Sequence, residues 1–403
     1  MRLYPLPTPN CRPSLLAYLP PLPLPLNLSL AAAKCHPHIA VTFRENIIGE
    51  IPLANEVVDA YDSATEAYLR GLFAPERHGR SCQIQSLDQL LEWQFDARHE
   101  LFQVTGLQRM REELADHVPT VQKSESEDFE NYTRTRCEIE VEPGFKLPFW
   151  LLEPRTDGPH PLALLPHGHD KFGMDTTVGL AHDDQHAETI RAEDRDVAVQ
   201  AVERGYIAIA PAARGTSSEI GIPDIKGRHG KRDCRSQLMH ALLAGRTATA
   251  ERVWDMMRLI DWALDEFDII ESQILVMGNS GGGVVTYYAA ACDDRITCAV
   301  PSCSYVSFVS KTGFIHHCDC NAVPGITRWG ESWDLVGLIA PRRICIVNGR
   351  QDRLFPLNEV DRAVAGAKRI YDAIGHSDRF EHNYGPAGHR FYSDLMWPFI
   401  SKM

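Results

Sequence analysis

The chain has 403 residues, of which 44% are hydrophobic and 24% charged, so it can bury the core of an ordinary globular protein. Its formal net charge is -13 at pH 7, and we find no run of basic residues. Nucleic-acid-binding proteins usually present a basic face, and an anionic membrane repels an acidic surface. We therefore expect neither a nucleic acid nor a membrane as partner.

The cysteines bear on the cellular compartment. There are 11 of them, an odd number, and several lie in apolar runs, which favours buried free thiols and a cytoplasmic location. A secreted protein is the alternative, because residues 1–33 carry two arginines before an apolar stretch, in the outline of a signal peptide. Prolines within that stretch oppose a helix, so we interpret residues 1–50 as a Pro-rich disordered tail or leader.

Residues 51–130 are predicted to form a helical N-terminal arm. Ser86 and Gln89 have the spacing of a capping box, and Gly106 is a plausible helix end. Apolar residues follow the cap at helical spacing, namely Leu87, Leu90, Leu91 and Phe95. We see no catalytic constellation in this arm.

Residues 131–403 are predicted to form the catalytic domain. The domain opens with a hairpin around Pro143-Gly144, and short apolar strands then alternate with helices. The expected strands are 137–141, 147–152, 162–165, 206–210, 274–277, 296–300, 343–347 and 380–384, and the expected helices lie around 197–202, 253–264 and 360–374. This order predicts an α/β fold with a mostly parallel sheet and helices on both faces.

The segment Gly278-Asn279-Ser280-Gly281-Gly282 follows one of these strands and precedes a helix rich in small residues. A serine on such a sharp strand-to-helix turn needs neighbours without bulk, and the turn exposes its hydroxyl group at the carboxyl end of the sheet. The pattern predicts a nucleophile elbow with Ser280 as the nucleophile.

An acid and a base follow in the chain. Asp352 lies just beyond the strand 343–347, and only Asp319 competes with it for the role of the acid. His389 lies on a Gly-rich loop after the last predicted strand. The order Ser, Asp, His is that of α/β-hydrolase triads, in which the histidine activates the serine and the aspartate orients the histidine.

The turn His167-Gly168-His169 follows an early strand, where a backbone N–H can contribute to an oxyanion hole together with that of Gly281. The alternative is that His167 and His169 bind a metal ion, for which we find no third ligand. A second alternative is a zinc site in the cluster from His316 to Cys320, which lacks the second distant pair of ligands usual in such sites. We expect no metal ion and no organic cofactor, and interpret the cluster as part of the pocket wall.

Together these motifs resemble the acetyl xylan esterase-like branch of the α/β-hydrolases, which neighbours the dienelactone hydrolase and cephalosporin deacetylase groups. The resemblance covers about residues 55–403 and rests on the segments 278–283, 348–352 with 355–356, 388–392 and 167–169. It implies a triad of Ser280, Asp352 and His389, with Gly281 and His169 as oxyanion donors. It also implies hydrolysis of small acyl esters, with acetylated sugars as candidate substrates. Dienelactone hydrolases carry cysteine where this chain has Ser280.

Two rival functions stay open. The first is a peptidase of the prolyl-oligopeptidase kind, although residues 1–130 are too short and too helical for the β-propeller that those enzymes carry. The second is a catalytically inactive hydrolase domain that serves as a binding module. Segments 170–195 and 214–247 are the expected pocket walls, and their charged residues suggest a polar alcohol portion in the substrate. The sequence leaves the natural ester and the oligomeric state open.

Overall fold

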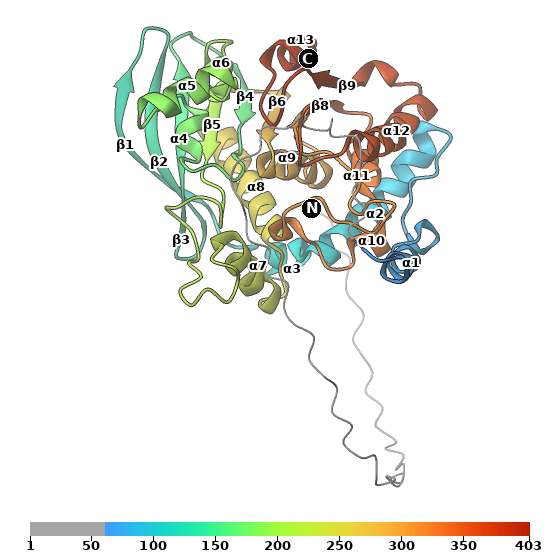
Figure 1. The fold of residues 1–403 in the computed structure, drawn as a ribbon. Helices are drawn as coiled ribbons and strands as arrows, with labels where there is room; N and C mark the ends of the chain where they lie inside the picture. Colours follow the sequence, from blue (N-terminus) through green and yellow to red (C-terminus); the bar gives the residue numbers. More distant parts are fainter. Residues whose placement is uncertain (1–60) are drawn as a thin grey trace, which may run out of the picture. The chain divides into compact units, whose positions relative to one another are not determined.

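The computed structural model describes residues 61–403, which form a nine-stranded mixed sheet with helices on both sides. The strand order is β1-β2-β3-β5-β4-β6-β7-β8-β9, with β1 at one edge and β9 at the other (Figure 1). The strands are β1 Thr120–Asp128, β2 Tyr132–Glu142, β3 Phe145–Pro154, β4 His160–Leu164, β5 Ile207–Pro211, β6 Ile269–Asn279, β7 Cys298–Ser302, β8 Arg343–Gly349 and β9 Phe380–Gly385.

The α-helices fill most of the connections between these strands. They are α1 Ser63–Leu72, α2 Leu87–Thr105, α3 Leu107–Glu113, α4 Met174–Thr177, α5 Asp184–Ala192, α6 Val197–Val202, α7 Asp233–Leu243, α8 Ala248–Glu266, α9 Gly281–Cys292, α10 Ile326–Trp329, α11 Ser332–Ile339, α12 Leu357–Ala373 and α13 Ser393–Ile400. Three short 3-10 helices are η1 Pro75–Arg77, η2 Asp319–Asn321 and η3 Ser377–Arg379.

The predicted fold class is confirmed. From β5 through β4 and β6 to β9 every neighbouring pair of strands is parallel, whereas β1, β2 and β3 pair antiparallel and β3 joins β5 antiparallel. The central strands are buried on both faces, which explains why they read as continuous apolar runs rather than as an alternation.

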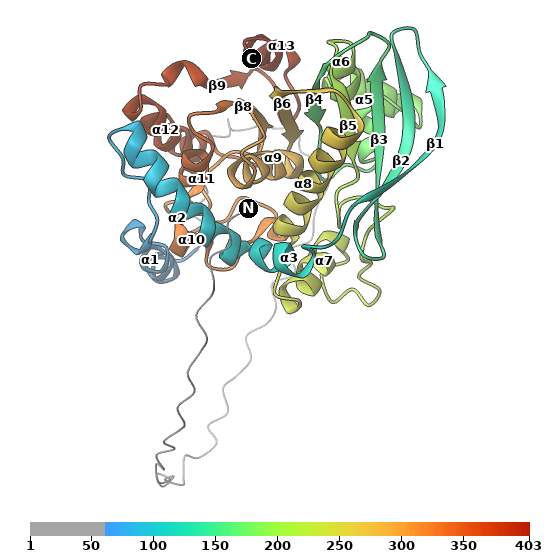
Figure 2. The ribbon, with the colours of Figure 1, turned by 180° about the vertical axis from the view of Figure 1, so that it is seen from behind.

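The alternation of side chains along each strand divides the core into two clusters, one on each face of the sheet. In β4 and just after it, Leu162 and Leu164 belong to one cluster and Ala163 and Leu165 to the other. The first cluster includes residues of α2, α3, α8, α9, α11 and α12, and the second those of α4, α6 and α13. Figure 2 shows α3 beside α8. All twelve residues of α9 are buried, so the helix that follows Ser280 has no solvent face.

The helical arm contains α1, α2 and α3. Ser86 caps α2 by accepting the N–H of Gln89, and Gly106 ends it with a left-handed φ of 84°. The predicted apolar stripe was wrong in part, because Leu91 and Phe95 are 52% and 80% exposed. The buried face of α2 consists instead of Leu90, Gln94, Ala97, Leu101, Phe102 and Thr105. The polar Gln94 joins this face because its amide group donates to the carbonyl groups of Gly337 and Ala340.

The predicted helical character of residues 51–130 also fails at its end. Residues 120–128 form β1, which pairs with β2 and extends the sheet. Most side chains of β1 face solvent, so its sequence is polar and lacks the apolar alternation that would predict a strand. The predicted tail of residues 1–50 and residues 51–60 lie outside the described residues. Within residues 61–403, no helix combines the length and the apolar character needed to cross a membrane.

The packing of α2 yields a stability prediction. Leu101→Ala removes a side chain that is fully buried between the arm and the sheet domain, and the free energy of unfolding is expected to fall by about 2–5 kcal/mol. Leu91→Ala in the same helix is the matched control and is expected to change it by less than about 0.5 kcal/mol. Urea denaturation measures both. Equal effects would mean that α2 does not pack as described.

Candidate active site

Ser280 occupies the turn between β6 and α9 with φ 57° and ψ -121°, a conformation that non-glycine residues rarely adopt. Two backbone hydrogen bonds hold the strained turn. The N–H of Ser280 donates to the carbonyl oxygen of Ser302, and the N–H of Val284 donates to the carbonyl oxygen of Ser280. The glycine at position 282 is required by close approach, because a Cβ atom there would lie 2.0 Å from the carbonyl oxygen of Pro166. This is the geometry that the sequence predicts for a nucleophile elbow.

The turn after β4 packs directly on this elbow. A Cβ atom on Gly168 would lie 2.8 Å from the carbonyl oxygen of Asn279 and 3.0 Å from the Cβ of Ser280, so only glycine fits. The ring of His167 holds the turn from the other side: Nδ1 hydrogen-bonds the carbonyl of Gly168 at 2.8 Å, and Nε2 accepts the N–H of Ala213 at 2.9 Å. Burial lowers the pKa of His167, consistent with a neutral ring. Both ring nitrogens of His167 form hydrogen bonds with the backbone, so the alternative that His167 and His169 together bind a metal ion is not supported.

Gly281 and His169, the predicted oxyanion donors, lie next to each other. A Cβ atom on Gly281 would be 3.4 Å from the Cα of Gly168 and 3.5 Å from Nδ1 of His169. Within residues 61–403, neither the N–H of Gly281 nor that of His169 donates a hydrogen bond to a protein group. Both therefore have free hydrogen-bonding capacity beside Ser280.

His389 and Asp352 meet across the loops that follow β9 and β8. Nδ1 of His389 hydrogen-bonds Oδ2 of Asp352 at 2.7 Å, and the carboxylate is only 3% exposed. The other carboxylate oxygen accepts the N–H of Leu354 at 2.9 Å. The rival acid Asp319 instead forms ion pairs with Arg235 and Arg232. Ser280 and His389 line the same cavity, although no hydrogen bond joins them in the described part of the chain.

The loop that carries His389 is held through its backbone carbonyl groups. The hydroxyl group of Tyr392 donates to Gly388 at 2.6 Å, while Oγ of Ser302 and the amide of Asn279 donate to Arg390 at 3.0 and 3.2 Å. Asn279 thus links the elbow to the histidine loop, a role that the motif alone did not reveal. These bonds limit the movement of His389 on both sides.

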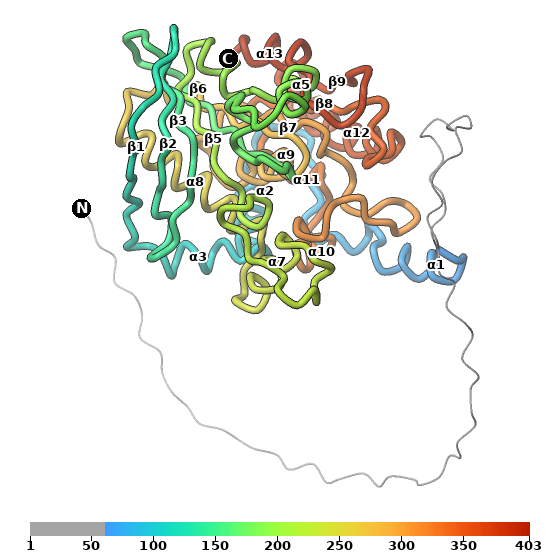
Figure 3. Tube along the Cα trace, turned by 60° about the vertical axis from the view of Figure 1, so that its left-hand side comes forward, coloured from blue at the N-terminus to red at the C-terminus, as the bar shows by residue number. Residues whose placement is uncertain are grey.

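A second segment supports the same loop. The guanidinium group of Arg390 binds Asp194, and the indole N–H of Trp397 donates to Gln200. Figure 3 shows the α5 region beside the C-terminal helix α13. Residues 193–200, which follow α5 and run into α6, therefore help to place His389.

Two neighbouring cavities meet at His169 and Asp170. The one that contains Ser280 and His389 measures about 60 Å³, and its wall includes the ion pair of Asp170 with Arg195. The other is a groove of about 470 Å³ with a charged wall. That wall is formed by 169–171, 215–218, 231–234 and Cys318. The expected pocket walls 170–195 and 214–247 thus both contribute, and they contain the helices α4, α5 and α7 rather than loops alone.

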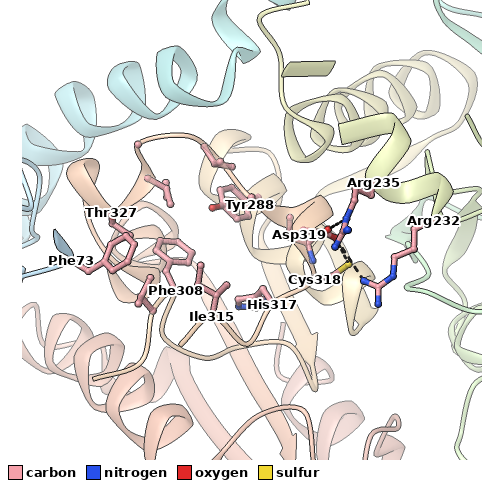
Figure 4. Close-up of a pocket in the computed structure, with 16 residues that line it drawn as sticks. Phe73, Arg232, Arg235, Tyr288, Phe308, Ile315, His317, Cys318, Asp319 and Thr327 are labelled. Atoms are coloured by element: carbon pink, nitrogen blue, oxygen red, sulfur yellow. Dashed lines mark hydrogen bonds and ion pairs between the residues drawn. The ribbon is translucent and has the colours of Figure 1, made fainter. Parts of the chain in front are cut away.

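A larger cavity of about 530 Å³ adjoins the groove at Arg232 and Cys318, and Ser280 is not among the residues that line it. Figure 4 shows that Phe73, Phe308 and Ile315 form one end of it, whereas Arg232 and Asp319 form the other. The cluster from His316 to Cys320 was predicted to line the active-site pocket. His317, Cys318 and Asp319 instead line this separate cavity, and only Cys318 also lines the groove next to His169.

The same cluster has neighbours that the sequence did not indicate. Cys318 and Cys320 lie against the ring of His169, and Cys234 from the first turn of α7 completes a group of four potential ligands. We missed this group because Cys234 is a single cysteine far from the others in sequence. A second group combines Cys303 with Asp352 and His389, but burial raises the pKa of the Cys303 thiol to about 12, which keeps it protonated.

Both the sequence and the structure of the chain resemble those of known proteins. A family model described as X-Pro dipeptidyl-peptidase (S15 family) matches residues 143–343, which include Ser280 and His169 but not Asp352 or His389. YtaP of Bacillus subtilis (strain 168), which is named as a hydrolase, is 24% identical over 304 residues, covering 73% of this chain and 93% of YtaP.

Many solved structures have a similar fold, and the following two cover most of this chain. BF1801 from Bacteroides fragilis NCTC 9343, described as an acetyl xylan esterase, is 18% identical with a TM-score of 0.64, covering 87% of this chain and 98% of its own. The chain has the α/β-hydrolase fold. Methylesterase BT1017 has the same fold at 20% identity and a TM-score of 0.58, covering 84% of this chain and 67% of BT1017.

The contact between the elbow and the turn after β4 can be tested without any substrate. Gly282→Ala places a methyl group against the Pro166 carbonyl oxygen, so we expect the free energy of unfolding to fall by about 1–3 kcal/mol or more. Gly71→Ala is the control, since no atom lies within 4 Å of the added methyl group in α1. Thermal unfolding compares the two variants. A Gly282→Ala protein as stable as Gly71→Ala would contradict the described elbow.

Proposed function

We propose that this chain is a serine carboxylic-ester hydrolase that acts on small acyl esters. The observation that carries the proposal is the hydrogen bond of 2.7 Å between His389 and the buried Asp352, at the wall of the cavity that contains the strained Ser280. A serine hydroxyl group is a weak nucleophile at neutral pH and needs a base positioned in this way.

The mechanism follows from which atoms of the triad already form hydrogen bonds. Nδ1 of His389 is bound to Asp352, which leaves Nε2 to accept the proton of Ser280 Oγ as that oxygen attacks the ester carbonyl. The N–H groups of Gly281 and His169 then bind the oxyanion, and each such donor contributes about 3 kcal/mol in the transition state. His389 returns the proton to the departing alcohol, and a water molecule activated by the same ring hydrolyses the acyl-enzyme.

The size of the cavity suggests the acyl group. About 15 Å³ of space holds one water molecule, so a cavity of about 60 Å³ accepts only a few heavy atoms. An acetyl group meets this limit, whereas a long acyl chain does not.

The adjoining groove suggests the alcohol. Its wall carries Lys171, Lys231, Arg232 and Asp233, which offer hydrogen-bond donors and acceptors to a hydroxylated molecule. We therefore infer an acetylated saccharide as the substrate class. The name of BF1801, an acetyl xylan esterase, agrees with this inference.

Two other candidates have specific support. The S15 family match favours a peptidase. The similarity to Methylesterase BT1017 favours a methyl ester, in which case the small cavity would hold the methoxy group and the groove would hold a sugar acid.

A panel of substrates tests the proposal. We expect hydrolysis of 4-nitrophenyl acetate, a marked fall in kcat/KM from acetyl to longer acyl chains, and release of acetate from acetylated xylo-oligosaccharides. Ser280→Ala is expected to lower kcat by about four to six orders of magnitude, because it removes the attacking oxygen.

Each alternative has its own signature in the same panel. Cleavage of X-Pro dipeptide anilides without ester hydrolysis would favour the peptidase, and release of methanol from methylated uronic acids would favour the methylesterase. Activity that survives Ser280→Ala would contradict the proposed nucleophile. A folded protein without activity on any of these compounds would favour the binding module.

A further inference from the structure

Four side chains from three separate segments converge beside the candidate active site. They are His169 after β4, Cys234 in the first turn of α7, and Cys318 and Cys320 around η2. One ligand atom from each lies within 4.8 Å of all the others. Of the four, Cys234 and Cys320 are buried and His169 is exposed.

The distances match those of a tetrahedral metal centre. Nε2 of His169 lies 3.6 Å from Sγ of Cys318 and 3.5 Å from Sγ of Cys320. In a tetrahedral zinc site, with Zn–S near 2.3 Å and Zn–N near 2.05 Å, a sulfur and a nitrogen ligand are about 3.6 Å apart. The side chains therefore need little movement to coordinate a common ion.

The surroundings favour thiolates at this point. The guanidinium group of the buried Arg252 lies 3.6 Å from Sγ of Cys320, and it provides positive charge next to the cluster. The nearby carboxylate of Asp319 forms ion pairs with Arg235 and Arg232, as Figure 4 shows. It also accepts a hydrogen bond of 3.2 Å from the Cys318 thiol, which zinc binding would replace.

We propose that His169, Cys234, Cys318 and Cys320 bind one zinc ion. Three thiolates and one imidazole form a Cys3His set, in which zinc has no open position for a water molecule, so the ion is structural rather than catalytic. Binding displaces the remaining thiol protons into solvent, and no oxidation or reduction accompanies it. The groove of about 470 Å³, lined by three of the ligands, gives the ion a path of entry.

The ion would fix segments that otherwise lack regular structure. Residues 212–232 and 303–318 are long connections without an α-helix or a strand, and α7 and η2 are joined at the ends of these connections. Closing such loops through one ion restricts the unfolded chain and stabilises the native arrangement. His169 also contacts the elbow, since its Nδ1 would lie 3.5 Å from a Cβ atom on Gly281. The zinc ion would thereby hold the turn that carries a predicted oxyanion donor.

Metal analysis of the full chain tests the proposal independently of activity. The protein is purified under reducing conditions, incubated with zinc, dialysed and measured by inductively coupled plasma mass spectrometry. We expect one zinc ion per chain in the wild type and in Ser280→Ala, and less than about one tenth of that in Cys234→Ala. Cys292→Ala is the matched control, because both cysteines are 5% exposed and lie in helices, and it is expected to keep one ion.

Cobalt substitution keeps the test decisive if Cys234→Ala does not fold. Cobalt bound by the wild-type chain is expected to show thiolate-to-metal charge-transfer absorption and the intense visible bands of a tetrahedral site. Substoichiometric zinc in the wild type, or an octahedral cobalt spectrum, would overturn the proposal. So would a disulfide among these cysteines, found by mass spectrometry after alkylation of the freshly purified protein. Because Ser280→Ala retains the metal, failure of the proposed esterase activity leaves this result unaffected.

Discussion

The close contact of two backbone turns is the constraint on which the rest of the site depends. The turn after β4 lies against the turn between β6 and α9 so closely that Gly168 and Gly282 admit no side chain. This contact is possible because β4 and β6 are parallel neighbours, whose carboxyl ends reach the same edge of the sheet. It sets the N–H groups of Gly281 and His169 beside Ser280. The complete burial of α9 prevents the elbow from moving away.

The loop that carries His389 is also held in place through its backbone. Side chains of Asn279 and Ser302, from outside the loop, and of Tyr392, at its end, bind its carbonyl groups and so help to fix the position of His389. Asn279 at the end of β6 pairs in register with Ser302 at the end of β7, and Tyr392 lies directly before α13. A buried network of this kind is stable only when every polar group finds a partner, which links the geometry of the site to the packing beneath it.

The sequence predicted the parts of the fold that local chemistry determines. The apolar strands and the hairpin were confirmed because each depends on residues that are close in the chain. For the same reason the sharp strand-to-helix turn at Ser280 lies where the glycine pattern predicts it. β1 was not recognised, since an edge strand with a polar surface has no apolar pattern. The exposure of Leu91 and Phe95 could not be foreseen because Gln94, three residues after Leu91, reaches two carbonyl groups of another helix. Only the tertiary fold brings Cys234 close to Cys318 and Cys320, so this proximity could not be predicted from the sequence.

The central claim is that Ser280 is an activated nucleophile. Labelling with a fluorophosphonate probe tests it most directly, because the probe forms a covalent bond only with a serine that a neighbouring base activates. Intact-mass analysis followed by peptide mapping of the labelled protein locates the adduct. We predict one adduct per chain, on Ser280, and none after His389→Ala or Asp352→Asn under the same conditions. An unlabelled wild-type protein, or an adduct on another serine, would contradict the account.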